Sequence, residues 1–275
     1  MWRSPEFSLT IYGITDVLFS IITITRNNLQ GLQRTCDSIQ KQSFQGFEWL
    51  VIDGASDDGT IKFLENMKSS PPSFILSEPD DGIYDAMNKG IAHAGGFYLI
   101  FLNAGDVFAN EHTLEDITAT IQDLQETPDF IYGDAQEERS GKTPAYKPAR
   151  PYTKIAEGMF THHQAMIYRH DLVKTLRYDI TYKISADYKF TLQFLERSKT
   201  IVYCPFPLCL FESGGISQQQ ATLGRTEQFK SRQELKIVSP LHNHIISLQQ
   251  KIIWELRKRY PSLYWRLKSK SGLMK

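Results

Sequence analysis

The chain has few cysteines, no long hydrophobic run and no net charge, and each absence excludes a class of protein. Its 275 residues include three cysteines, too few and too scattered for a disulfide framework or a zinc site, so a reducing cytosol is the simplest compartment. No stretch reaches the roughly 18 apolar residues that a membrane-spanning helix needs. The best apolar run, residues 18–24, has no small-residue cleavage site after it, which argues against a signal peptide. With 31 basic and 31 acidic residues, a generally basic nucleic-acid binder is not expected.

Three glycine-containing signatures are also missing. No Gly-rich dinucleotide fingerprint follows the first apolar run, and there is no Gly-x-x-x-x-Gly-Lys phosphate loop. These absences argue against a dehydrogenase and against a phosphate-loop nucleotide hydrolase. There is no Gly-x-Ser-x-Gly elbow either, which argues against an α/β-hydrolase.

The charge is distributed unevenly along the chain. Residues 241–275 hold eight Lys or Arg and one acid, so this tail carries +7 and the remainder carries −7. Within the tail, Trp254, Tyr260, Tyr264 and Trp265 alternate with the bases, a pattern typical of a segment lying on a membrane surface. Each base near an anionic leaflet contributes about 1 kcal/mol. A helix packed on the body of the protein, or a short dimerising helix, is the alternative. The apolar seam of this tail is Leu241, Ile245, Leu248, Ile252 and Leu256.

Residues 17–134 alternate apolar, β-branched runs with helical patterns. This alternation predicts βαβ units, and hence an α/β fold with a mainly parallel sheet and helices on both faces. After an N-terminal arm (1–16), we expect a first half (17–134), a second half of the same domain (135–217) that opens with a polar loop over 135–160, and a helical, basic C-terminal extension (218–275). The expected strands are 17–25, 47–53, 73–77, 97–103 and 130–134, the helices between them 29–40, 58–67, 83–94 and 113–124, and the C-terminal helices 218–239 and 241–260.

Acidic residues follow several of the expected strands. Asp53, Asp81, Asp106 and Asp134 each lie at or just after the end of one strand. The carboxyl ends of parallel strands share one edge of the sheet, where ligands of open α/β sheets bind. Clustered carboxylates repel one another unless a cation lies among them. The pattern therefore favours a divalent metal, Mg²⁺ or Mn²⁺, that bridges to phosphates.

Three ordered strings carry a family resemblance: FSIITITRNN, WLVIDGASDDGT and SEPDDGIYDAMNKGIAHAGGFYLIFLNAGD. Together they resemble the family 2 glycosyltransferases, which have the GT-A fold, and within them the branch that builds bacterial surface polysaccharides of the colanic-acid type. The resemblance is strong over 18–110, moderate to about 215 and absent in the tail. It implies transfer of a hexosyl or N-acetylhexosaminyl group from a UDP- or GDP-sugar, with inversion, to a saccharide acceptor on a lipid carrier.

The resemblance also implies roles for individual residues. The acid retained in Ile184–Tyr188 is Asp187, which fits the catalytic base, although Ala186 replaces a family glutamate. At the family's metal-binding Asp-x-Asp this chain has Asn103 and Gly105, so Asp106 is the expected ligand of Mn²⁺ or Mg²⁺, held mainly together with the donor diphosphate. His163, Gln164, Gly214, Gly215 and Ser217 are expected to contact the acceptor or the diphosphate. The residues expected to bind the nucleotide sugar are Thr23, Thr25, Arg26, Asn27, Asp53, Asp81, Gly82, Asp85, Lys89, Asn103 and Ala104.

Simpler structural roles remain open for several of these residues. The whole role of Asp106 and Asp187 could be to cap a turn or a helix, and Lys89 could be a solvated helix residue. Two other functions also remain: a catalytically inactive nucleotide-sugar-binding scaffold, and a sugar-1-phosphate nucleotidyltransferase. The latter should show a Gly-rich basic loop after the first strand, which Thr25 to Asn28 do not form. The leading hypothesis is a cytoplasmic transferase, peripheral on the inner face of the plasma membrane and able to form oligomers, with a polyprenyl-linked saccharide as acceptor and no nucleic-acid partner.

Overall fold

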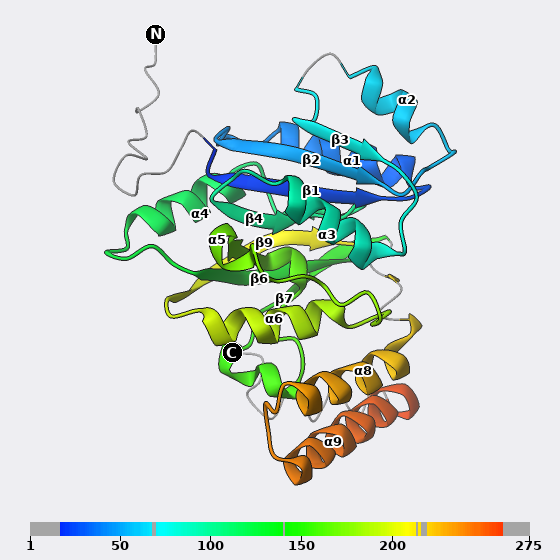
Figure 1. The fold of residues 1–275 in the computed structure, drawn as a ribbon, viewed down its shortest axis with the longest axis vertical. Helices are drawn as coiled ribbons and strands as arrows, with labels where there is room; N and C mark the ends of the chain where they lie inside the picture. The colour runs from blue at the N-terminus through cyan, green and yellow to red at the C-terminus, as the bar shows by residue number, and fades with distance from the viewer. Residues whose placement is uncertain (1–16, 68–69, 140, 213, 216–218, 261–275) are drawn as a thin grey trace.

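A computed structural model describes residues 17–260 except 68–69, 140, 213 and 216–218. The expected N-terminal arm, Ser217 and the end of the basic tail lie outside the described residues. The chain forms one mixed sheet with helices on both faces, and a pair of helices stands at one end (Figure 1).

The first half of the sheet is parallel, as the alternation predicts. Its strands lie in the order β3-β2-β1-β4. All seven residues of β1 are buried, because this central strand is covered by helices on both faces. The elements are β1 (Phe19–Thr25), α1 (Leu29–Gln40), β2 (Phe47–Asp53), α2 (Thr60–Glu65), β3 (Phe74–Ser77), α3 (Ile83–His93), β4 (Tyr98–Phe101) and α4 (Thr113–Gln122).

The second half of the sheet is mixed. The strand expected over 130–134 does not lie beside β4, because β8 (Met166–Arg169) enters between them and is antiparallel to both. The expected polar loop over 135–160 is wrong in its first part: β6 (Phe130–Arg139) continues into it and pairs with β7 (Lys142–Lys147). The remaining elements of this half are β5 (Val107–Phe108), η2 (Tyr152–Glu157), η3 (His163–Ala165), α5 (His170–Val173), α6 (Ala186–Arg197) and β9 (Ile201–Phe211).

Two hydrophobic clusters cover the two faces of the sheet. One contains Leu32 and Ile39 of α1 with Ile117 of α4. The other contains Met87 of α3 and Phe190 of α6. This arrangement confirms the α/β fold with helices on both faces.

The C-terminal extension consists of α8 (Ala221–Glu234) and α9 (Pro240–Arg259), which lie side by side (Figure 1). Ser239 caps α9 by accepting from the N–H of His242 at 3.3 Å, and Pro240 occupies its first turn. Most of the apolar seam predicted for α9 points to solvent: Leu241, Ile245, Leu248 and Ile252 are 45–74% exposed. Among the described residues, no helix combines the length and apolar character needed to cross a bilayer.

Candidate active site

Asp53 organises the turn after β2. Its side chain is fully buried at the end of the strand, opposite Thr25 of β1. The carboxylate accepts hydrogen bonds from the N–H of Ser56 (3.0 Å), from Ser56 Oγ (2.5 Å) and from Ser77 Oγ (2.6 Å). These charge-assisted bonds hold the ends of β2 and β3 together and fix the shape of the turn.

The loop after β1 joins this turn to the loop after β4. The N–H of Asn27, which has a φ of +50°, donates to Ser56 Oγ at 2.7 Å. Asn28 caps α1 by accepting from the N–H of Gly31, and its Nδ2 donates to the carbonyl of Ala104 at 3.1 Å. The Arg26 side chain, 64% exposed, reaches within 3.9 Å of Asp80. The structure therefore brings Arg26, Asn27, Asp53 and Ala104 to one edge of the sheet.

Thr23 belongs to the core and does not line this edge. Its side chain is fully buried, and its Oγ1 accepts a hydrogen bond from Trp49 Nε1 at 3.0 Å. Two residues later, Thr25 ends the strand on the same face. The expectation of a nucleotide contact fits Thr25 and is not supported by the position of Thr23.

The segment around the start of α3 is held by its own side chains. Gly82, with a φ of +113°, precedes the helix and donates to Asp80 Oδ1 at 2.9 Å, and the N–H of Asp81 donates to Asp85. Lys89 Nζ bonds Glu78 at 2.9 Å, Asp85 at 3.2 Å and the carbonyl of Pro79 at 2.8 Å. Three partners account for the three donors of this ammonium group, so a phosphate would have to displace one of them.

Asp106 is a buried carboxylate in the loop after β4. It accepts from Gln164 Nε2 at 2.5 Å and from the N–H of Glu212 at 3.1 Å. Burial raises the pKa of Asp106 to about 6, and the nearby charge of Glu212 also raises it. Among the described residues, no three His, Cys, Asp or Glu side chains lie close enough together to hold a metal ion by themselves. The side chains that offer oxygen atoms around Asp106 are the carboxylates of Asp106 and Glu212 and the amides of Asn103 and Gln164.

His163 lies between the loop after β4 and the start of α6. Its Nε2 is 3.2 Å from Asn103 Nδ2, and its Nδ1 is 4.0 Å from Asp187 Oδ2. Burial lowers the pKa of His163 to about 4, so the ring is neutral at pH 7. The preceding residue, His162, stacks on Phe211 with the ring centres 3.6 Å apart. The pair His163–Gln164 thereby connects Asp187 with Asp106.

Asp187 occupies the first turn of α6. Its Oδ1 accepts from the N–H of Tyr188 at 2.8 Å, but the N-cap position of the helix is Ser185, so Asp187 is not the cap. The side chain is 21% exposed. Burial raises the pKa of Asp187 to about 6. A carboxylate that is mostly ionised at pH 7 yet partly exposed can accept a proton from a bound hydroxyl group.

Three buried polar atoms at this edge have no hydrogen-bond partner within the described part of the chain. They are Thr25 Oγ1, Asn103 Oδ1 and Gln164 Oε1. Buried polar atoms in folded proteins are almost always hydrogen-bonded, because an unsatisfied one costs roughly 1–3 kcal/mol. A ligand with polar groups would satisfy them.

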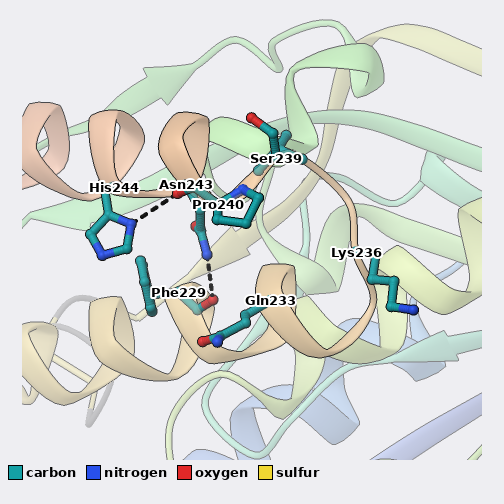
Figure 2. A pocket seen from close by; sticks show the side chains of 8 residues that line it. Phe229, Gln233, Lys236, Ser239, Pro240, Asn243 and His244 are labelled. Atoms are coloured by element: carbon teal, nitrogen blue, oxygen red, sulfur yellow. Dashed lines mark hydrogen bonds between the residues drawn. The ribbon is translucent and has the colours of Figure 1, made fainter.

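A separate cavity lies away from this sheet edge, in the C-terminal extension. A cavity of about 490 Å³ opens between α8 and α9, lined among others by Phe229, Pro240, Asn243 and His244 (Figure 2). Asn243 donates to the carbonyl of Phe229 at 3.0 Å, and His244 Nδ1 is 2.8 Å from the carbonyl of Pro240. Those polar groups already have partners, so we place the chemistry at the sheet edge.

Several residues at this edge were not predicted from the sequence. Ser56 and Ser77 bond Asp53, and the N–H of Glu212 bonds Asp106, in contacts that no sequence motif marks. Glu227 of α8 bonds the turn before α6, which only the tertiary contact reveals. Of the predicted Gly-rich loop, Gly214 and Gly215 are described, and both their carbonyls accept from Gln219.

Comparisons with known proteins agree with this architecture. The family model described as Glycosyl transferase family 2 matches residues 20–207. An uncharacterized glycosyltransferase of Mycobacterium tuberculosis is 32% identical over 209 residues, covering 73% of this chain and 77% of the relative. The amylovoran biosynthesis glycosyltransferase AmsB of Erwinia amylovora is 25% identical over 194 residues, covering 65% of this chain and 64% of the relative.

Solved structures show the same fold. S. aureus TarS 1–349 in complex with UDP-GlcNAc superposes with a TM-score of 0.66 at 19% identity, covering 87% of this chain and 73% of the other. The mannosyltransferase PcManGT of Pyrobaculum calidifontis, in complex with GDP-Man and Mn²⁺, gives a TM-score of 0.62 at 14% identity, covering 94% and 79%. With the strand order, the sheet edge and the family match together, the chain belongs to glycosyl transferase family 2 and is a glycosyltransferase of the GT-A fold.

Proposed function

We propose that this glycosyltransferase moves a sugar, with inversion, from a UDP- or GDP-sugar to a saccharide acceptor. The observation that carries the proposal is the set of unpartnered atoms Thr25 Oγ1, Asn103 Oδ1 and Gln164 Oε1 beside the carboxylates Asp106 and Asp187. A hydrophobic ligand would leave those atoms unsatisfied, whereas a sugar nucleotide offers hydroxyl groups to each.

Asp187 is the general base in this proposal. Inversion needs a group that takes the acceptor hydroxyl proton as the oxygen attacks the anomeric carbon on the side opposite the leaving diphosphate. The pKa of about 6 leaves Asp187 mostly ionised at pH 7 and makes it a stronger base than an ordinary aspartate. The neutral His163 lies beside this base, with its Nδ1 4.0 Å from Asp187 Oδ2.

In this proposal the loops after β1, β2 and β4 bind the nucleotide part of the donor. Thr25, Arg26, Asn27 and Ala104 would line the pocket, and Asp53 would act chiefly by holding the turn through Ser56 and Ser77, with contact to base or ribose as its further role. Asp81, Gly82, Asp85 and Lys89 would close over the donor.

A divalent cation fits the chemistry of the donor set near Asp106. Carboxylate and amide oxygens are the ligands that Mg²⁺ and Mn²⁺ prefer. Asp106 and Glu212 repel each other, and the amide oxygens of Asn103 and Gln164 have no partner among the described residues. Asp106 would hold the metal with Asn103, Gln164 and the donor diphosphate. The bound ion would stabilise the charge that develops on the leaving diphosphate.

The acceptor is proposed to be a lipid-linked saccharide reached from an anionic membrane surface. Relatives named for amylovoran and for PGL/p-HBAD biosynthesis, the latter in Mycobacterium bovis at 32% identity over 181 residues, make glycans or glycolipids an apt acceptor class. Most of the apolar seam of α9 faces solvent, and fully burying each such exposed side chain is worth roughly 1.5–3 kcal/mol. The +7 charge of residues 241–275 attracts an anionic surface and repels a second copy of the same segment.

Transfer itself is tested with Asp187→Asn. We expect loss of turnover by about 10²- to 10⁴-fold, while thermal stabilisation by UDP- or GDP-sugar with Mn²⁺ is retained. Asp171→Asn, which alters an exposed ion pair with Arg169, is the matched control and should keep full turnover. Analysis of the anomeric configuration of the product tests inversion. Nucleotide-sugar binding without turnover in the unaltered protein would instead support the scaffold alternative.

Membrane contact is tested by replacing Ile245 and Leu248 with Ser together. Sedimentation with phosphatidylcholine vesicles that contain phosphatidylglycerol should fall, and the same variant should not alter transfer to a water-soluble acceptor. Gln249→Ser, an exposed polar neighbour, is the control. Unchanged sedimentation, or a concentration-dependent dimer that the double variant abolishes, would refute membrane contact through this face.

A further inference from the structure

Glu227 of α8 holds the turn that leads into α6. Its carboxylate accepts hydrogen bonds from three consecutive backbone N–H groups, those of Lys183 (2.7 Å), Ile184 (2.9 Å) and Ser185 (2.8 Å). The side chain is only 8% exposed. A buried carboxylate is costly unless it is well bonded, and here three charge-assisted bonds are all directed at one short turn.

The same turn is fixed from other sides as well. Tyr84 of α3 donates its hydroxyl proton to the carbonyl of Ile184 at 2.7 Å, and Ser185 Oγ donates to the carbonyl of Gly224 at 3.0 Å. Gly224 allows α8 to come this close, because a Cβ at that position would lie 3.1 Å from Ile184 Cγ2 and 3.3 Å from Ser185 Oγ. The turn therefore has little freedom to move while α8 is docked.

We propose that Glu227 is a positioning residue of the transfer reaction, which sets the Asp187 carboxylate by fixing the turn 183–185. The inference rests on the proposed role of Asp187 as base. Asp187 is two residues beyond Ser185 and in the first turn of α6, so a shift of the turn moves the carboxylate relative to His163. Positional errors of 1 Å can cost about 10²-fold in rate.

This role assigns part of the active site to the C-terminal extension. The family match ends at residue 207, whereas Glu227 and Gly224 lie on α8. The buried residues of α8 are Gly224, Glu227, Ser231 and Arg232, so this face carries no large apolar side chain, and Arg232 is held by Asn243 of α9 at 2.7 Å. Such a face contributes little hydrophobic stabilisation and is better explained by its hydrogen bonds to the turn.

The negative charge of Glu227 also acts on Asp187 directly, because it disfavours a second carboxylate nearby and so adds to the raised pKa. Removing this charge should lower the pKa of Asp187 and move the acid limb of the rate profile to lower pH. The titratable groups that face Asp187 come from five elements or loops: Tyr84 of α3, His163 of η3, Tyr168 of β8, Tyr178 before α6, and Glu227 of α8.

Glu227→Gln tests the proposal. The amide keeps one acceptor oxygen and places an NH₂ group against backbone donors, so the turn loses part of its support. We expect kcat to fall by about 10- to 100-fold, the KM for the donor to stay unchanged, and the acid limb to move to lower pH. Glu227→Asp should recover part of the rate. Gln233→Ala, at an exposed position of the same helix, is the control and should leave kcat and the pH profile unchanged.

Circular dichroism and the melting temperature are measured for each variant, and rates are given per folded molecule. A folded Glu227→Gln variant with the wild-type kcat and pH profile would overturn the proposal, and so would a lower melting temperature with unchanged kcat. Asp187→Asn distinguishes failure of the proposed base from failure of the positioning role. If that variant retains turnover, the proposed base is wrong; if it is inactive while Glu227→Gln is unaltered, only the positioning role fails.

Discussion

Replacing Asp187 by Asn should stabilise the protein while it abolishes turnover. Burial raises the pKa of this carboxyl from 3.8 to about 6, a difference of about two units. At 1.36 kcal/mol per unit, the ionised group costs the folded state about 3 kcal/mol at pH 7.5. An asparagine of the same shape carries no charge, and its Oδ1 can still accept from the N–H of Tyr188. We therefore expect the free energy of unfolding to rise by up to about 3 kcal/mol.

The sign of the pH dependence follows from proton binding. Between about pH 4 and pH 6 the folded state binds more protons at Asp187 than the unfolded state does, so the contribution of this group to stability falls as the pH rises through that window. The gain in the free energy of unfolding from Asp187→Asn is therefore largest above pH 6 and disappears below pH 4. For a chain of this size, about 3 kcal/mol corresponds to a rise in melting temperature of roughly 6–12 °C.

Thermal unfolding at pH 7.5 and at pH 4 is the assay. Asp171→Asn is the matched control, because the hydrogen bond and charge of Arg169 lower the pKa of Asp171, so neutralising it should not stabilise the protein at pH 7.5. A lower melting temperature for Asp187→Asn at pH 7.5, or an equal gain at both pH values, would refute the reasoning that this carboxylate is held ionised at a cost.

Four further outcomes are expected. kcat should rise with pH, reach half its maximum near pH 6 and level off about one pH unit higher, because only ionised Asp187 accepts the acceptor proton; a steady-state pH profile checks this, and a flat profile from pH 5 to 8 would contradict it. Asp106→Asn should raise the Mn²⁺ concentration for half-maximal turnover by roughly 10-fold or more, measured by metal titration. Asp53→Ala frees Ser56 and Ser77 and should weaken UDP- or GDP-sugar binding in calorimetry, with an unchanged Kd as the contrary result. Gly96→Ala should lower the free energy of unfolding by about 1–3 kcal/mol in urea titrations, because its Cβ would lie 2.7 Å from a backbone nitrogen of β1.

The sequence predicted the first half of the fold well because its strands are buried on both faces. The run 47–53 and the helix 29–40 coincide with β2 and α1, since apolar runs and helical spacing there are uninterrupted. The hairpin of β6 and β7 could not be predicted in the same way. Only one of the six residues of β7 is buried, so its sequence has no apolar signal.

The sequence pointed to individual residues of the candidate site but not to the contacts that join them. Strand ends identified Asp53 and Asp106, and the family pattern identified Asp187 and His163. The pairing of β8 between β4 and β6, which brings His163 and Gln164 between Asp106 and Asp187, depends on contacts far apart in the chain. Glu227 illustrates the same limit, because a glutamate on a polar helix gives no sign that it binds a turn 42–44 residues earlier.

The two neighbouring histidines before β8 have different roles: His162 packs on an aromatic ring, and His163 lies at the candidate active site. His162 stacks on Phe211, while the next two residues contact the carboxylates, His163 at Asp187 and Gln164 at Asp106. Inserting or deleting one residue here would shift the register and so disturb the stacking on Phe211 together with both carboxylate contacts. A change of length in this short stretch should therefore disturb more contacts at once than the replacement of any one of its side chains.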